Sequence, residues 1–137
     1  MASFGSFSIA IENFKTRANQ RTASVIKRVL ADIFRDLVLE TPRATGYAQS
    51  KWGVGLSIPK LDPSRGGPGP YPSPVPQGVS VIKGLQIGEG LVCYMYNNCR
   101  YIRFLEFGSA TIAPAAMVRT VLTRFQNYVA NAAATKG

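Results

Sequence analysis

The segment VIKRVLADIFRDLV, residues 25–38, decides the fold, because apolar side chains recur in it at steps of three and four residues. This spacing places them on one face of an α-helix. A second apolar row widens that face and gives the helix a broad side to bury. The rows consist of Phe14, Ala18, Val25, Val29, Ile33 and Leu37, and of Ile26, Leu30, Phe34 and Val38. We therefore predict one long helix over residues 8–39, ending before Pro42.

Downstream of this helix, a period of two replaces the helical spacing. From Trp52 to Ile58, apolar residues occupy every second position, which is the pattern of a half-buried strand. Residues 59–78 hold most of the prolines, so we predict one long exposed Pro/Gly-rich loop there. Two interpretations of the loop stay open: it orders against a neighbouring subunit, or its PSPVP stretch docks on a proline-reading domain. Residues 79–96 predict a β-hairpin.

The C-terminal part of the chain predicts two further elements. Residues 101–107 form a short helix or strand that ends at Gly108, and Pro114 suits the first turn of a second helix. Apolar residues at helical spacing continue that second helix: Met117, Val121, Leu122, Phe125, Tyr128, Val129 and Ala132. The order predicts a single α+β domain over residues 1–137, in which a small antiparallel sheet is packed by the long N-terminal helix and the C-terminal helix.

Composition argues against catalysis. The chain has 137 residues, seven carboxylates and no histidine, so the commonest general base is missing and we expect no enzyme activity. We expect no cofactor or metal, and we expect Cys93 and Cys99 to be reduced thiols. Asp32 and Asp36 share a helix face, where pairing with Arg28 or Arg35 is favoured over a divalent ion.

The formal net charge of +9 favours polyanionic neighbours, either nucleic acid or acidic protein surfaces. The sequence contains no zinc-finger, ribonucleoprotein or phosphate-loop motif. No apolar run approaches the roughly 18–20 residues that span a bilayer, and the N-terminus lacks a secretory pattern. We therefore expect no membrane partner and a protein made and used inside a cell or a particle assembled there.

Two segments carry a resemblance to a known family. They are TPRATGYAQSKW, residues 41–52, and YIRFLEFGSATIAPAAMVRTVLTRF, residues 101–125. In order and spacing they resemble the tail-component family of tailed phages, the neck or tail-completion proteins. The residues that match the family motifs are Pro42, Thr45, Gly46, Ser50 and Trp52, then Tyr101, Leu105, Glu106, Phe107 and Gly108, and then Ala113, Pro114, Met117, Val118 and Arg119.

The resemblance implies a structural virion protein of the head–tail neck. It would form a homo-oligomeric ring, expected to be a hexamer, that joins head to tail around the DNA ejection channel. Its partners would be itself, head-completion or portal-side proteins, and the tail terminator or tail tube, with non-specific proximity to phage DNA. It would be assembled in the host cytoplasm and end in the virion. The alternatives are a tail terminator that caps the tube and, in a different class, a basic DNA-binding packaging accessory.

The motif residues can also be interpreted physically. Gly46 and Gly108 are expected to supply backbone conformations or close approaches that a side chain would obstruct. Glu106 lies between apolar neighbours, so we expect it to be partly buried, with Arg119 or the backbone amides of the second helix as partners. Trp52 is expected to anchor the core or an interface. The candidates for contacts between subunits or for the ring lumen are Lys15, Arg17, Arg21, Arg65 and Tyr71.

Overall fold

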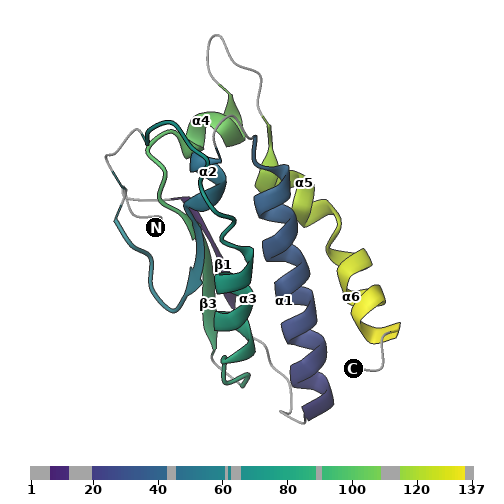
Figure 1. Ribbon diagram of the computed structural model, residues 1–137. Coiled ribbons are helices and arrows are strands. Elements are labelled where there is room, and N and C mark those ends of the chain that lie inside the picture. Colours follow the sequence, from purple (N-terminus) through teal and green to yellow (C-terminus); the bar gives the residue numbers. More distant parts are fainter. Residues whose placement is uncertain are drawn as a thin grey trace.

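A computed structural model describes residues 7–12, 20–42, 46–60, 62, 66–88, 91–108 and 115–134 of the chain. Strands and helices are mixed along it, so the predicted α+β class is confirmed (Figure 1). The elements in chain order are β1 (Phe7–Glu12), α1 (Gln20–Glu40), α2 (Tyr47–Ser50), β2 (Trp52–Gly55), α3 (Val75–Lys83), β3 (Val92–Asn97), α4 (Ile102–Phe107), α5 (Met117–Thr123) and α6 (Phe125–Ala134).

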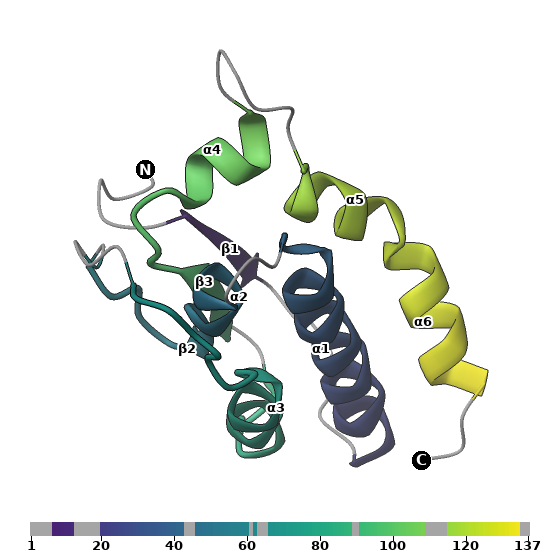
Figure 2. The same ribbon diagram turned by 45° about the horizontal axis from the view of Figure 1, so that its top comes forward.

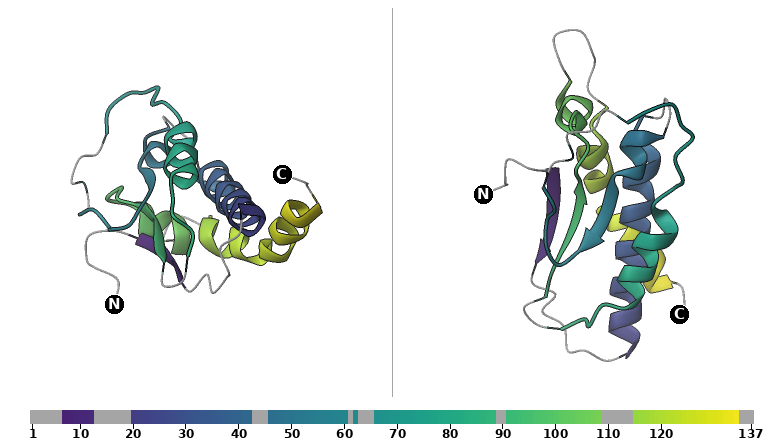
Figure 3. Two further views of the ribbon diagram at one scale, coloured as in Figure 1. Left: turned by 90° about the horizontal axis from the view of Figure 1, so that it is seen from below. Right: turned by 60° about the vertical axis from the view of Figure 1, so that its left-hand side comes forward.

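The three strands form one antiparallel sheet in the order β1-β3-β2. Met95 lies opposite Ile9 of β1 on one side and opposite Val54 of β2 on the other, so β3 is the central strand. Alternate residues of β3 are buried, namely Cys93, Met95 and Asn97. Figure 3 shows α1 and α3 on the same side of the sheet, so the helices cover one of its faces.

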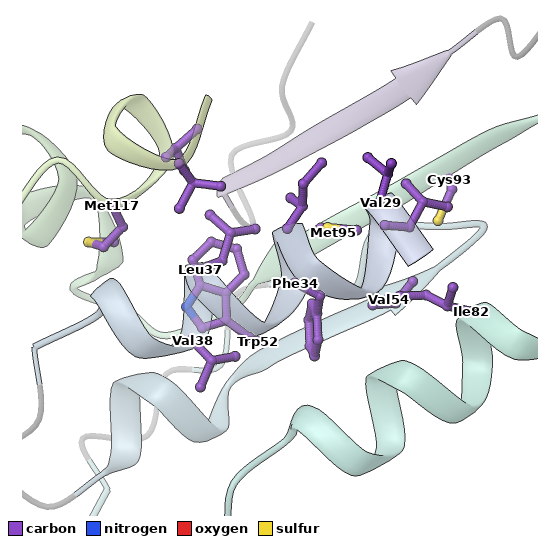
Figure 4. Close-up of a cluster of buried hydrophobic side chains, with 14 of the residues drawn as sticks. Val29, Phe34, Leu37, Val38, Trp52, Val54, Ile82, Cys93, Met95 and Met117 are labelled. Carbon is purple, nitrogen blue, oxygen red and sulfur yellow. The ribbon is translucent and has the colours of Figure 1, made fainter. Parts of the chain in front are cut away.

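The long helix α1 lies at the centre of the core. Leu30, Phe34 and Leu37 on its inner face are almost fully inaccessible to solvent. Figure 4 shows this face packed against Trp52 and Met95 of the sheet, with the Phe34 ring directed toward α3. Burial of each large apolar side chain contributes roughly 1.5–3 kcal/mol, which explains why this part of the predicted helix is confirmed.

The predicted start of the N-terminal helix is wrong. Residues 7–12 form strand β1, the helix α1 begins only at Gln20, and residues 13–19 lie outside the described part of the chain. The segment FSIAIE has apolar residues at alternate positions, which also fits a strand. Residues 7–12 are a strand and not a helix because they pair with β3, which is distant in the sequence. Such a pairing cannot be inferred from the local sequence pattern.

The predicted hairpin over residues 79–96 is also wrong, as is the C-terminal end of the predicted loop. Helix α3 occupies residues 75–83, so the loop ends near Pro74, and β3 pairs with β1 and β2 instead. Pro74 caps the helix and Pro76 lies in its first turn, where no backbone N–H donor is required. The proline-rich composition therefore marks a helix start and not only a loop.

Near the C-terminus the predicted second helix is divided into α5 and α6, which meet at Arg124. Figure 2 shows both running along the outer side of α1. The Tyr128 hydroxyl donates a hydrogen bond to Asp36 of α1 at 2.5 Å, and Arg124 pairs with Glu40 at 3.1 Å. These contacts attach the C-terminal helices to the central helix. Asp32 pairs with Arg28 and Arg35, as predicted.

The bond between Tyr128 and Asp36 predicts a loss of stability at high pH. Burial and this hydrogen bond raise the pKa of Tyr128 to about 12, above the ordinary value of about 10. The unfolded chain therefore loses the phenolic proton before the folded chain does, so this contribution is complete below pH 10 and declines between about 10 and 12. Tyr101 adds a decline of the same sign, because burial raises its pKa to about 12 as well.

We expect Tyr128→Phe to unfold with a shallower decline in melting temperature over this alkaline range than the parent chain. Thermal melts across the range, together with a tyrosinate absorbance titration, measure both effects. Because Tyr101 is retained, the decline is reduced and not abolished. An unchanged slope in the variant would contradict the role assigned to Tyr128.

Candidate functional site

The second motif, around α4 and the start of α5, is built on a buried carboxylate. Glu106 of α4 is completely inaccessible to solvent. Its Oε1 accepts the Val118 backbone N–H at 2.8 Å, and its Oε2 accepts the Arg119 backbone N–H at 3.3 Å and the Arg119 Nε at 3.0 Å. The Arg119 guanidinium also donates to the Glu106 backbone carbonyl at 2.5 Å. We call this group, Glu106 with Val118 and Arg119, the Glu106 clamp.

Backbone geometry around the clamp explains the glycine of the motif. Gly108 follows α4 with a φ of 79°, a region that side chains disfavour, and its N–H bonds to the Phe104 carbonyl at 2.8 Å. Ala115, just before α5, lies beside α4, because its N–H donates a hydrogen bond to the Leu105 carbonyl at 2.7 Å. Met117 then starts α5 with its side chain fully buried. The expected burial of Glu106 is present, and both partner types predicted for it occur together.

The first motif is also part of the folded interior. Trp52 is 3% exposed, and its indole N–H donates to the Thr41 hydroxyl at 2.8 Å. Gly46 has a φ of 89° at the start of α2, so of the two roles expected of this glycine the special backbone conformation is present. The Ser50 hydroxyl closes the same turn by donating to the Tyr47 carbonyl at 2.6 Å. Pro42 is exposed at the end of α1.

A contact between three tyrosines joins the two motifs, and sequence reasoning did not find it. The Tyr47 ring lies 5.2 Å from that of Tyr71 and 6.5 Å from that of Tyr101. Tyr71, a predicted contact between subunits, is half-buried and packs inside its own chain. The Pro/Gly-rich loop therefore packs on the first motif through Tyr47, which in turn contacts the second motif at Tyr101.

The remaining predicted site residues cannot be placed in the site. Five of them lie outside the described residues, namely Thr45, Pro114, Lys15, Arg17 and Arg65. Arg21 lies in the first turn of α1, but its side chain is outside the described part as well.

Helices α4, α5 and α6 expose apolar side chains, including three, Leu122, Phe125 and Val129, that the sequence pattern places in a buried stripe. Phe104 and Phe107 of α4 are 56% and 54% exposed, and Leu122, Phe125 and Val129 are 49%, 44% and 37% exposed. Leu122 lies near the end of α5, and Phe125 and Val129 lie one turn apart in α6. The Arg119 guanidinium of α5 lies over the Phe107 ring of α4, 5.3 Å from its centre. We call these five residues the apolar strip.

Two other kinds of site have little support in the described residues. Cys93 and Cys99 are free and buried, and burial raises the pKa of both thiols. Within the described ranges, no three histidine, cysteine or acidic side chains lie together in a group that could hold a metal ion. None of the helices traced there combines the length and the apolar character needed to cross a bilayer.

No protein-family model matches the chain, and no curated protein or solved structure matches it. The resemblance to phage tail components therefore rests on the two motifs and their order along the chain.

Proposed function

We propose that the chain is a structural subunit of a tailed-phage neck, acting in tail completion or head–tail joining, and that it assembles into a ring around the DNA channel. It acts by association with other copies and not by catalysis. The observation that carries the proposal is the apolar strip. Large exposed apolar side chains on three successive helices of a folded protein favour a role in protein–protein contacts.

The arrangement of the strip suits a ring. Val118, Val121 and Tyr128 of α5 and α6 are buried against the core, and the exposed Leu122, Phe125 and Val129 flank this buried face of the same two helices. A closed ring requires a contact in which one surface meets a different surface of the next copy. In this proposal the strip is one of those two surfaces, and the Glu106 clamp holds α4 and α5 in the geometry that presents it.

The charge of the chain supports a position beside DNA. A net charge of +9 on 137 residues attracts a polyanion, and a channel wall needs this attraction without sequence-specific contacts. The same charge favours the second candidate function, a DNA-binding packaging accessory. That candidate predicts tight duplex binding by the monomer with a steep dependence on salt, whereas a ring subunit binds duplex weakly before assembly.

Assembly tests the proposal. We expect the double variant Leu122→Asp/Phe125→Asp to remain a folded monomer under conditions in which the parent chain forms rings. Two carboxylates inside an apolar contact are expected to weaken each contact by several kcal/mol, or about a hundredfold or more. Native mass spectrometry measures the number of subunits, and electron microscopy shows whether the particle is a ring with a central channel.

Leu56→Asp is the matched control, because Leu56 is 64% exposed and lies outside the strip. It should assemble as the parent chain does. Rings formed by the strip variant, or a parent chain that stays monomeric with neck partners present, would overturn the proposal. If rings form as expected, antibody labelling of intact virions in electron micrographs would distinguish a subunit of the neck from a tail terminator.

A further inference from the structure

A groove between α1 and α3 concentrates positive charge away from the apolar strip. Its volume is about 350 Å³, and it is lined by Lys27, Arg28, Ala31 and Arg35 of α1 and by Val79, Ile82 and Lys83 of α3. Arg28, Arg35 and Lys83 are exposed, so we take the cations as its edges. Its apolar residues are less exposed and form its floor: Ala31 and Val79 are half-buried and Ile82 is buried. Lys27 and Arg35 are eight residues apart on one helix, which corresponds to a length of about 12 Å. We call this feature the basic groove.

Interactions among the described residues leave most of this charge uncompensated. Asp32 accepts from Arg28 at 3.3 Å and from Arg35 at 3.0 Å, so one carboxylate is shared between two guanidinium groups. The Lys27 ammonium donates to the backbone carbonyl of Lys83 at 2.7 Å, which satisfies one donor without neutralising the charge. Arg28 and Arg35 remain about half exposed and can accept a further anionic partner.

The compensating charge does not come from the described side chains of a second copy. Each carboxylate whose side chain is described already pairs with a cation of its own chain: Asp32 with Arg28 and Arg35, Asp36 and Glu40 with Arg124, Asp62 with Lys51, and Glu106 with Arg119. A second copy would have to break one of these pairs in order to fill the groove. Among the acidic side chains that the structure describes, this leaves none free to fill the groove of a second copy, which favours an acidic partner of a different kind.

The shape of the groove favours a protein segment over nucleic acid. Duplex DNA presents its phosphates on a convex surface, which contacts exposed ridges better than a concavity between two helices. The apolar floor of Ala31, Val79 and Ile82 also has no complement in a phosphate backbone. A segment that carries both acidic and apolar side chains matches the edges and the floor together.

We propose that the basic groove is a docking site for an acidic, apolar segment of a different protein. The segment places carboxylates against Lys27, Arg28, Arg35 and Lys83 and apolar side chains on the floor between them. This site is distinct from the apolar strip, so it does not depend on ring formation. One subunit can then bind a copy of itself through the strip and an unlike partner through the groove.

The test uses a fluorescent peptide of glutamate and leucine, about three helical turns long. Fluorescence anisotropy measures its binding to the full chain. We expect Lys27→Glu/Lys83→Glu to weaken binding about tenfold or more, since reversing two edge charges removes two attractions and adds two repulsions. The milder Lys27→Gln/Lys83→Gln pair should weaken binding in the same direction by a smaller factor, and it serves as the test if the reversal variant does not fold.

Arg100→Glu/Arg103→Glu is the matched control. It changes the net charge by the same amount, both arginines are exposed, and they lie at or beside α4, away from α3 in Figures 1 and 2. We expect it to bind the peptide within about twofold of the parent chain, as an effect of net charge alone. An all-glutamate peptide of equal charge should bind more weakly than the glutamate–leucine peptide, because it cannot use the floor.

Three results would overturn the proposal. The first is a parent chain that does not bind the glutamate–leucine peptide. The second is an equal loss of peptide affinity in the groove variant and the control variant, which would mean that net charge alone accounts for binding. The third is a duplex oligonucleotide whose binding is selectively lost in the groove variant while peptide binding is retained, which would make nucleic acid the occupant. Native mass spectrometry of the same variants reports ring formation separately, so failure of the groove and failure of the ring are distinguishable.

Discussion

Replacing Glu106 with alanine is expected to lower the free energy of unfolding by about 2–5 kcal/mol, the range for truncating a large buried side chain to alanine. Its carboxylate accepts the backbone N–H groups of Val118 and Arg119 and the Arg119 side chain. Without it, the Val118 N–H is left in a buried position with no acceptor, which is costly. The removed side chain also leaves a cavity between α4 and α5.

Urea titration followed by circular dichroism measures the loss of stability. The Glu106→Gln variant shows how much of this loss comes from the hydrogen bonds and how much from the missing side-chain volume. Glutamine has nearly the same shape but only one carbonyl acceptor, so we expect a loss between those of the parent chain and the alanine variant. Arg119 is 55% exposed, so its charge can return to water in both variants. A Glu106→Ala chain within about 1 kcal/mol of the parent would show that the clamp does not hold α4 and α5 together.

Replacing Gly78 with alanine is expected to destabilise the fold by about 2–3 kcal/mol through overpacking. A Cβ built on Gly78 would overlap the Phe34 ring, with two further ring atoms at 2.6 and 2.7 Å. Gly78 is in α3 and Phe34 is in α1, so this glycine allows the two helices to approach closely. The effect opposes the usual benefit of alanine in a helix, which is about 1 kcal/mol over glycine.

Gly84→Ala is the control, because the nearest atom to its built Cβ is the Val81 carbonyl oxygen at 3.6 Å, an ordinary contact. It should change stability by less than about 0.5 kcal/mol, as expected of an unconstrained exposed position. Phe34→Leu should recover part of the Gly78→Ala loss, since the shorter side chain makes room for the added methyl group. A double-mutant cycle measures this coupling, and strictly additive effects would contradict the contact.

Sequence reasoning succeeded where a feature depends on nearby residues. The buried face of α1 follows from helical spacing, and Phe34 and Leu37 on it are fully buried. The partners of Glu106 were predicted because Arg119 and the opening of α5 follow it closely along the chain. The backbone requirement at Gly46 and Gly108 was predicted from residue type, and both glycines have positive φ.

The same reasoning failed where two local patterns compete. Residues 7–12 satisfy the strand period, yet they were joined to the helix that follows. Residues 79–83 were assigned to a hairpin, although half-buried Val79 and buried Ile82 have the spacing of a helix. Leu122, Phe125 and Val129 were counted in the buried face of the last helix, but periodicity alone does not say how far around a helix the core extends.

The α+β class, the buried face of the central helix and the partners of Glu106 follow from the sequence alone, because all of these depend on residue type and on spacing over a few turns. The tertiary structure decided the pairing of β1 with β3, the approach of α3 to α1 at Gly78, the apolar strip and the basic groove. Each of these depends on segments far apart in the chain, whose contact is set by how the core packs and not by any local pattern.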